Sequence, residues 1–176
     1  MRIISGKLKG RRFVAPDNLP VRPTTDYAKE SLFNIINNNY YFEDLQILDC
    51  FSGTGNISYE FLSRGVGHVT AFDADANCIA YQNKIKAELG LENFSPTRQD
   101  VFKALSSIQK RFDIIFCDPP YDMEKISEIP EIVFKHKLLT EDGWLIVEHS
   151  KKTNFRHSNY VETRRYGNVS FSIFSY

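Results

Sequence analysis

A short segment, Asp118-Pro119-Pro120-Tyr121, combines a carboxylate, two prolines and an aromatic ring. It directly follows the apolar run Phe112–Cys117, which is short and rich in β-branched residues and therefore predicts a buried strand. Two adjacent prolines continue neither a strand nor a helix interior, so they predict a stiff loop with few amide donors. Such a loop suits a planar substrate, held between the Asp118 carboxylate, a backbone carbonyl and the Tyr121 ring. An incidental strand-ending turn explains these four residues equally well.

A glycine loop is the second segment with chemical potential. An apolar strand beginning near Gln46 passes into this loop, and a helix is expected over 57–63, so backbone amides at the helix start can face a ligand. A dinucleotide-binding loop needs a third glycine, and Ser58 stands there. An acid before the loop suits a ligand with a cationic end, such as S-adenosylmethionine (SAM), which has no phosphate. A tight strand–helix turn is the alternative. The candidate cofactor-binding residues of this segment are Asp49, Phe51, Gly53 and Gly55.

Two further carboxylates follow predicted strands. Asp73 ends a strand over 69–73, twenty residues after Gly53, where an acid can accept hydrogen bonds from both ribose hydroxyls. Asp100 follows a weaker strand over 94–99 and can accept from an adenine amino group, with Val101 or Phe102 against the ring. Asp100 also fits the N-cap of a helix near 101–109, and the two roles are compatible.

The other predicted elements complete an α/β pattern. Helical spacing predicts helices at about 26–38, 75–89 and 125–137, the last kinked or split by Pro130. A turn is expected at 140–143, a strand at 144–149, and an antiparallel hairpin at 161–166 and 169–174. Five strand–helix steps and a hairpin predict a doubly wound, mostly parallel, Rossmann-like sheet with a C-terminal antiparallel hairpin. We expect one domain over 1–176, with an N-terminal extension over 1–40 and a core over 41–176.

The N-terminal extension carries most of its charge as cations. Residues 3–14 predict two short strands around a glycine-containing turn, residues 17–23 a proline-rich linker, and Thr24, Thr25 and Asp26 a helix cap. A small hairpin with basic side chains is a candidate nucleic-acid arm, although such charges also protect sheet edges. The cations on this hairpin are Lys7, Lys9, Arg11 and Arg12.

Composition narrows the class of protein. The 176 residues have no net charge, but residues 1–22 carry +5, residues 151–176 carry +4, and the middle carries −9. Basic ends can bind phosphates while an acidic centre does other work. No apolar run is long enough for a membrane helix, and the start lacks a signal-peptide core, so a cytoplasmic protein is expected. Three dispersed cysteines and four dispersed histidines predict neither disulfides nor a metal site.

Several motifs together resemble one family. Arg22-Pro23-Thr24-Thr25-Asp26, the segment 48–55 and Asp118-Pro119-Pro120-Tyr121 occur in that order, with further similarity over 2–11, 32–36 and 62–65. The set is similar to the RsmD-type 16S rRNA (guanine-N2)-methyltransferases, which have the class I SAM-dependent methyltransferase fold. Three departures are visible, one of which is a net charge lower than expected for an rRNA enzyme. Tyr27-Ala28-Lys29 replaces a more basic stretch, and Asp73 stands where the family usually has Glu.

The resemblance implies SAM-dependent methylation of the exocyclic N2 amine of one guanine in 16S rRNA, on the small ribosomal subunit or its assembly intermediate, by a monomer. The motif Asp118-Pro119-Pro120-Tyr121 would hold the base, and Arg22, Thr24 and Thr25 would join the basic hairpin in binding RNA. The four-residue motif serves adenine N6 equally well, so an adenine methyltransferase acting on DNA or RNA is one alternative. A noncatalytic SAM- or RNA-binding module and an NAD-dependent oxidoreductase are two others.

Overall fold

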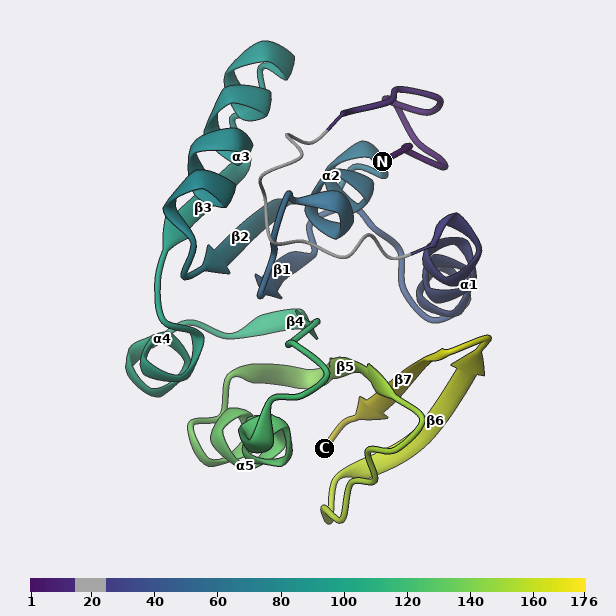
Figure 1. Ribbon diagram of the computed structural model, residues 1–176, viewed down its shortest axis with the longest axis vertical. Helices are drawn as coiled ribbons and strands as arrows, with labels where there is room; N and C mark the ends of the chain where they lie inside the picture. The colour runs from purple at the N-terminus through teal and green to yellow at the C-terminus, as the bar shows by residue number, and fades with distance from the viewer. Residues whose placement is uncertain (15–24) are drawn as a thin grey trace.

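The computed structural model describes residues 1–14 and 25–176, and within these ranges seven strands form one sheet (Figure 1). The strands, in sheet order, are β3 (Phe94–Arg98), β2 (His68–Asp73), β1 (Gln46–Cys50), β4 (Phe112–Cys117), β5 (Leu139–Ser150), β7 (Val169–Phe174) and β6 (Tyr160–Tyr166). Strands β1 to β5 are parallel, whereas β7 is antiparallel to both β5 and β6. The predicted doubly wound sheet with a C-terminal antiparallel hairpin is confirmed.

The chain reverses its winding direction between β1 and β4. It moves outward from β1 through β2 to β3 and then returns to β4, which lies on the other side of β1. In open α/β sheets the loops diverge at such a point and leave a crevice at the carboxyl ends of the strands. The Asp118 amide donates to the Cys50 carbonyl at 3.3 Å, so the ends of β4 and β1 remain joined where the crevice begins.

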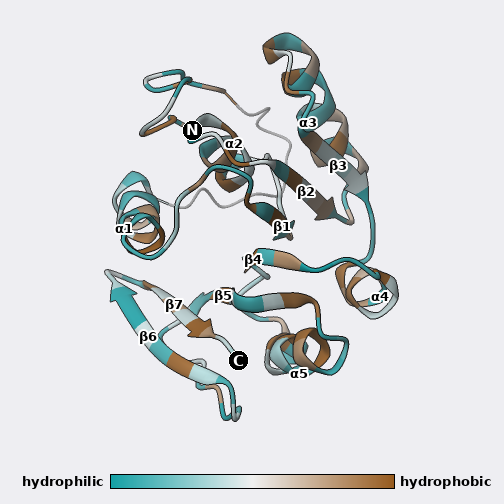
Figure 2. Cartoon of the chain, turned by 180° about the vertical axis from the view of Figure 1, so that it is seen from behind, coloured by the Kyte–Doolittle hydropathy of each residue, from teal (hydrophilic) through white to brown (hydrophobic). Residues whose placement is uncertain are grey.

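Helices cover both faces of the sheet. Apolar residues of α1 (Asp26–Asn37), α2 (Asn56–Ser63) and α3 (Ala76–Leu89) belong to the core on one face. Residues of α4 (Val101–Ser107), the 3-10 turn η1 (Glu124–Ser127) and α5 (Glu128–Lys135) belong to the core on the other. Figure 2 shows the apolar character of β1 and β2 and the polar end of β6.

Helix caps explain several boundaries. The Thr25 hydroxyl accepts from the Ala28 amide at 3.2 Å and begins α1, as predicted. The Asp75 and Asp100 side chains cap α3 and α4 in the same way, and Gly90 ends α3 in a left-handed conformation. Among the described helices none combines the length and the apolar character needed to cross a bilayer.

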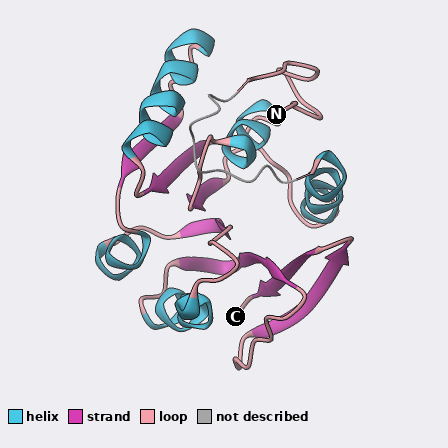
Figure 3. Ribbon diagram, viewed as in Figure 1, coloured by secondary structure: helices cyan, strands magenta, loops and turns pink. Residues whose placement is uncertain are grey.

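The predicted N-terminal strands are wrong. Figure 3 draws residues 1–14 as a loop, with one antiparallel bridge between Arg2 and Arg12. Strand pairing stops because the next amides bond to α2 instead: Ile4 and Ser5 donate to the Glu60 carboxylate, and Leu8 to the Ser63 hydroxyl. The predicted linker over 17–23 lies outside the described residues.

Two further boundaries differ from the prediction. The turn expected at 140–143 lies inside β5 as an irregularity, since Phe112 pairs with Leu139 but Ile114 already pairs with Trp144. The helix expected over 125–137 is split, as one of the two predicted outcomes, but it divides into η1 and α5 between Ser127 and Glu128 rather than at Pro130. Pro130 occupies the first turn of α5, where its missing amide needs no partner.

Candidate active site

A cavity of about 1000 Å³ lies at the carboxyl ends of the parallel strands, at the crevice between β1 and β4. Its wall draws on the N-terminal segment, the start of α1, the loops after β1 to β4, and the β6–β7 turn. Of the described residues that line it, five are carboxylates and none is Lys or Arg. The carboxylates are Asp49, Asp73, Asp100, Asp118 and Glu148. An acidic wall of this kind repels phosphate groups and attracts cationic or hydrogen-bond-donating ligands.

The glycine loop is held from two sides. The Asp73 carboxylate accepts from the Gly53 amide at 2.8 Å through one oxygen and from the Asp75 amide at 2.8 Å through the other. Gln82, buried in α3, donates to the Ser52 hydroxyl at 2.8 Å and to the Gly53 carbonyl at 2.7 Å. These bonds fix the loop against the end of β2. Asp73 still lines the cavity, and a carboxylate can accept additional hydrogen bonds.

Asp49 lies beneath the loop and is 1% exposed. Its carboxylate accepts from the Ser58 hydroxyl at 2.6 Å. Burial raises the pKa of Asp49 from 3.8 to about 7; the Ser58 hydrogen bond opposes this rise and the nearby Asp73 adds to it. The third-glycine position of a dinucleotide loop is therefore occupied here by a donor to a buried acid. A cationic ligand group in the cavity would favour the ionised form of Asp49.

Of the other predicted cofactor-binding residues, three line the cavity and Gly55 instead shapes the loop. Phe51, Asp100 and Val101 line the cavity, and the Phe51 and Phe102 rings meet edge to face at 6.3 Å. Asp100 also caps α4 by accepting from the Lys103 amide at 2.9 Å. Gly55 does not line the cavity. It begins α2 with φ +84°, and a Cβ there would lie 2.8 Å from the Tyr59 ring. Gly55 therefore shapes the turn rather than the wall.

The segment after β4 forms the opposite wall. Asp118, Pro119, Pro120 and Tyr121 all line the cavity, and the Tyr121 hydroxyl donates to the Glu148 carboxylate at 2.9 Å. Glu148 is 3% exposed and follows Val147, which pairs with Cys117. Asp118 and Glu148 each follow one residue after this last pair, and both line the cavity. Two carboxylates and one tyrosine ring thus meet at this end of the cavity.

The predicted RNA-binding residues have mixed positions. Lys7, Lys9, Arg11 and Arg12 are exposed on the N-terminal segment. Thr25 lines the cavity mouth and caps α1. Arg22 and Thr24 lie outside the described residues.

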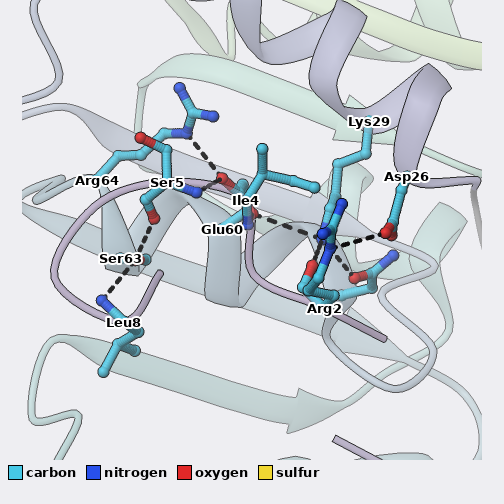
Figure 4. A network of polar contacts seen from close by, with 10 residues as sticks. Arg2, Ile4, Ser5, Leu8, Asp26, Lys29, Glu60, Ser63 and Arg64 are labelled. Carbon is cyan, nitrogen blue, oxygen red and sulfur yellow. Dashed lines mark hydrogen bonds and ion pairs between the residues drawn. The ribbon is translucent and has the colours of Figure 1, made fainter. Parts of the chain in front are cut away.

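A buried polar network attaches the N-terminal segment to the core (Figure 4). Lys29 is fully buried; its ammonium donates to the Arg2 carbonyl at 2.6 Å and to the Asn56 side chain at 2.9 Å, and pairs with Glu60 at 3.5 Å. Burial lowers the pKa of Lys29, which the Glu60 charge opposes. Glu60 also accepts from Arg64 at 2.9 Å. Since Asn56 lines the cavity, the network links the segment to the cavity wall.

The cavity fits SAM better than a dinucleotide. SAM carries an ammonium and a sulfonium group but no phosphate, and its ribose and adenine offer hydroxyl and amino donors. Asp49, Asp73 and Asp100 place three carboxylate acceptors on the cavity wall, a set that suits ammonium, hydroxyl and amino donors. The part of the chain that the structure describes contains no group of three His, Cys, Asp or Glu side chains that could hold a metal ion.

Sequence reasoning overlooked four residues of this site. Ser58 donates to Asp49, and Gln82 holds the glycine loop. Glu148 accepts from Tyr121, and Lys29 attaches the N-terminal segment. The signal for Glu148 was present in the sequence, because an acid interrupts the apolar run of β5. Ser58 was noted only as the residue at the third-glycine position, without its bond to Asp49, and no local pattern marks Gln82.

Comparison with known proteins gives consistent matches. The model of the family described as Conserved hypothetical protein 95 matches residues 1–175. The protein YlbH of Bacillus subtilis (strain 168) is 35% identical over 99% of this chain and 98% of its own length. Ribosomal RNA small subunit methyltransferase D of Escherichia coli (strain K12) is 32% identical over 84% of this chain and 71% of its own. A solved structure of yhhF from Escherichia coli has a TM-score of 0.85, with 26% identity over 99% of this chain and 96% of that one.

Proposed function

Because the chain belongs to the family Conserved hypothetical protein 95, the RsmD-type methyltransferases, we propose that it transfers a methyl group from SAM to the N2 amine of a guanine in 16S rRNA. The substrate is the small ribosomal subunit or its assembly intermediate, and the enzyme acts as a cytoplasmic monomer. The observation that carries the proposal is the cavity wall, which joins SAM-compatible acceptors to a carboxylate-and-tyrosine end of the kind that binds an amine-bearing base.

The chain's own residues position the cofactor. Asp49 accepts from the ammonium group, Asp73 from the ribose hydroxyls, and Asp100 from the adenine amine, with Phe51 and Val101 against the ring. Gly53 brings the backbone close to the ligand, and Gly55 holds the turn that makes this approach possible. When bound, SAM supplies a methyl group already activated for direct displacement. The enzyme therefore needs to align the nucleophile and exclude water rather than provide a strong base.

The Asp118-Pro119-Pro120-Tyr121 segment binds the base. A guanine amine is conjugated with its ring and is a weak nucleophile. Asp118 and the Pro119 carbonyl would accept hydrogen bonds from its two N–H groups, which would align the nitrogen with the methyl. As the new N–C bond forms, the bond from the methyl to the sulfonium sulfur would break, S-adenosylhomocysteine would leave, and the amine would lose one proton to water. Pro120 keeps the loop rigid, and Tyr121 stacks on the base, an interaction worth about 1–3 kcal/mol. A paired base must first be flipped out of its helix, at a cost of a few kcal/mol.

Glu148 supports guanine rather than adenine. Beside its N2 amine guanine carries an N1–H donor, whereas adenine presents a bare N1 acceptor beside its N6 amine. Glu148, a buried carboxylate on the same cavity wall as Asp118, accepts from the guanine N1–H but repels the adenine N1 lone pair. Glu148 lies at this end of the cavity and already accepts from Tyr121. The alternative adenine-N6 activity lacks an observation of this kind in its favour.

Two matched variants test the role of Glu148. Purified variants would be incubated with labelled SAM and small subunits from cells lacking the protein. Glu148→Gln should lower methyl transfer about tenfold or more, since it weakens a charge-assisted hydrogen bond to the base, with SAM affinity unchanged. Tyr121→Phe, which removes only the hydroxyl bonded to Glu148, should lose less because the stacking ring remains. Equal losses would show that Glu148 acts only through Tyr121, and the guanine argument would fail.

A further inference from the structure

A second cavity lies against the C-terminal hairpin, outside the catalytic cavity. We call it the hairpin cavity; its volume is about 170 Å³. Lys151, Arg165, Thr163 and Ser170 contribute to its wall, and no Asp or Glu does among the described residues around it. This composition is the reverse of the catalytic cavity, whose described lining residues include five carboxylates and neither Lys nor Arg. The two cavities therefore select ligands of opposite charge.

Ser170 marks the hairpin cavity as a site for an acceptor-rich ligand. Its side chain is fully buried, and its hydroxyl has no hydrogen-bond partner among the described residues. Leaving such a group without a partner is costly, so buried hydroxyls are nearly always bonded. Ser172, two residues along the same strand, is equally buried but bonded to both His149 and Thr163 at 2.7 Å. The contrast shows that β7 can satisfy a buried serine at one position and leaves the other directed at the cavity.

Cations border the same position. Arg165 pairs in register with Ser170, which in turn pairs with His149, so the three form one row across β6, β7 and β5. The positive charge of Arg165 contributes to the lowered pKa of His149, after burial and against the Ser150 hydrogen bond. Within the described ranges neither Lys151 nor Arg165 forms an ion pair, whereas the adjacent Arg164 pairs with Glu162 at 2.9 Å. Two cations and a hydroxyl donor are a suitable set for a phosphate group.

The hairpin cavity and the catalytic cavity share strands. On β5, Glu148 lines the catalytic cavity and the next residue, His149, lines the hairpin cavity. On the hairpin, Tyr166 and Val169 line the catalytic cavity, and their neighbours Arg165 and Ser170 line the other. A nucleic-acid strand whose base enters the acidic cavity needs its phosphates neutralised elsewhere. Because successive strand residues point to opposite faces of a sheet, the hairpin cavity presents its cations on the face opposite the catalytic cavity, at the same end of β5 and of the hairpin.

We propose that the hairpin cavity binds a backbone phosphate of the RNA strand that carries the target base, through Lys151, Arg165 and the Ser170 hydroxyl. The proposal rests on the proposed rRNA function and names a contact that anchors the strand while the base occupies the catalytic cavity. The basic C-terminal segment thereby acquires a specific role, since Lys151 and Arg165 supply two of its five cations.

The cations are tested by pairs of neighbouring substitutions. Lys151→Ala and Arg165→Ala should each weaken binding to small subunits about tenfold. Each should also reduce the slope of log affinity against log salt concentration by about one, the change expected for one lost phosphate contact. Lys152→Ala and Arg164→Ala are the controls, because each removes one positive charge from a neighbouring residue that does not line the cavity. SAM affinity should be unchanged in all four. Cavity variants that lose no more than their controls would overturn the proposal.

The buried hydroxyl allows a sharper comparison. Ser170→Ala removes a group without a protein partner, so it should leave the melting temperature unchanged or raise it, yet weaken RNA binding several-fold. Ser172→Ala should do the opposite, because it breaks two hydrogen bonds and Ser172 itself does not line the cavity. The last measurement is the melting temperature of the wild type and of Ser170→Ala with added inorganic phosphate. If it stabilises the wild type but not Ser170→Ala, while RNA affinity is the same in both, the site binds a free anion and the RNA assignment is wrong.

The outcomes separate this proposal from the proposed function. Cavity-dependent RNA binding without methyl incorporation would retain the phosphate site and refute the methyltransferase assignment. Methyl incorporation together with an RNA affinity that the cavity substitutions do not change would retain the methyltransferase assignment and refute the phosphate site. A wild-type protein that binds no RNA would contradict both.

Discussion

Replacing Asp49 with Asn should stabilise the ligand-free protein in a pH-dependent manner. The buried Asp49 carboxyl has a pKa of about 7 against an ordinary 3.8, so the folded protein holds this proton more tightly than the unfolded chain. Wild-type stability therefore falls, on account of this group, as pH rises from about 4 to about 7, and changes no further above that. Asn carries no charge to bury and keeps an oxygen that can accept from Ser58.

The size of the effect follows from the pKa. A tenfold change in proton affinity is worth about 1.4 kcal/mol, so a rise from 3.8 to about 7 corresponds to about 4 kcal/mol. Water entering the open cavity lowers this figure, so it is an upper limit. For a chain of this size 1 kcal/mol shifts the melting temperature by about 2–4 °C. Asp49→Asn should thus melt up to about 8–16 °C above wild type at pH 8, with the gap closing near pH 4.

Calorimetric melting of both proteins at several pH values measures the gap directly. Asp75→Asn is the control, since Asn is an equally good cap and the charge change is the same. It should differ from wild type by less than about 0.5 kcal/mol at every pH. A gap between Asp49→Asn and wild type that stays constant from pH 4 to pH 8 would refute the burial argument. The same variant should bind SAM more weakly at pH 7.5, because the ammonium loses its carboxylate.

Three further predictions concern catalysis and the N-terminal attachment. Asp118→Ala should abolish methyl transfer yet leave the SAM dissociation constant, measured calorimetrically, within about twofold; a large loss of SAM binding would contradict its role at the base. Lys29→Met should lower the free energy of unfolding by about 3–5 kcal/mol in urea titrations, because Glu60 loses a buried partner. Adding Glu60→Gln should recover part of that loss. Gly6→Ala should detach the N-terminal segment and increase proteolysis there, since its φ is +82° and a Cβ would clash with the Ser63 carbonyl oxygen.

Periodicity and caps predict most of this fold. The apolar faces of α1 and the short runs of β1, β2 and β4 are strong local signals, and Thr25, Asp75 and Gly90 mark helix ends with ordinary chemistry. The N-terminal strands were predicted incorrectly because alternating residues around glycines look the same whether their amides pair with a strand or with Glu60 and Ser63. Only the tertiary position of α2 decides between the two.

The candidate site was predictable where strand ends carry acids. Parallel strands bring their carboxyl ends together, so Asp49, Asp73 and Asp118 reach one cavity whatever lies between them. Supporting residues were not predictable in this way. Ser58 and Gln82 act through contacts made only after α2 and α3 dock, and Glu148 gains its meaning from Tyr121, 27 residues earlier in the chain. Gly143 likewise has a tertiary role, since a Cβ there would lie 3.0 Å from the Phe112 carbonyl oxygen of β4.

Nucleoside mass spectrometry of 16S rRNA from cells with and without this protein tests the central claim most directly. The proposed function predicts the loss of a single N2-methylguanosine when the protein is absent, and its return when the wild type, but not Asp118→Ala, is supplied. Unchanged N2-methylguanosine together with a lost N6-methyladenosine would contradict the guanine assignment and the role given to Glu148.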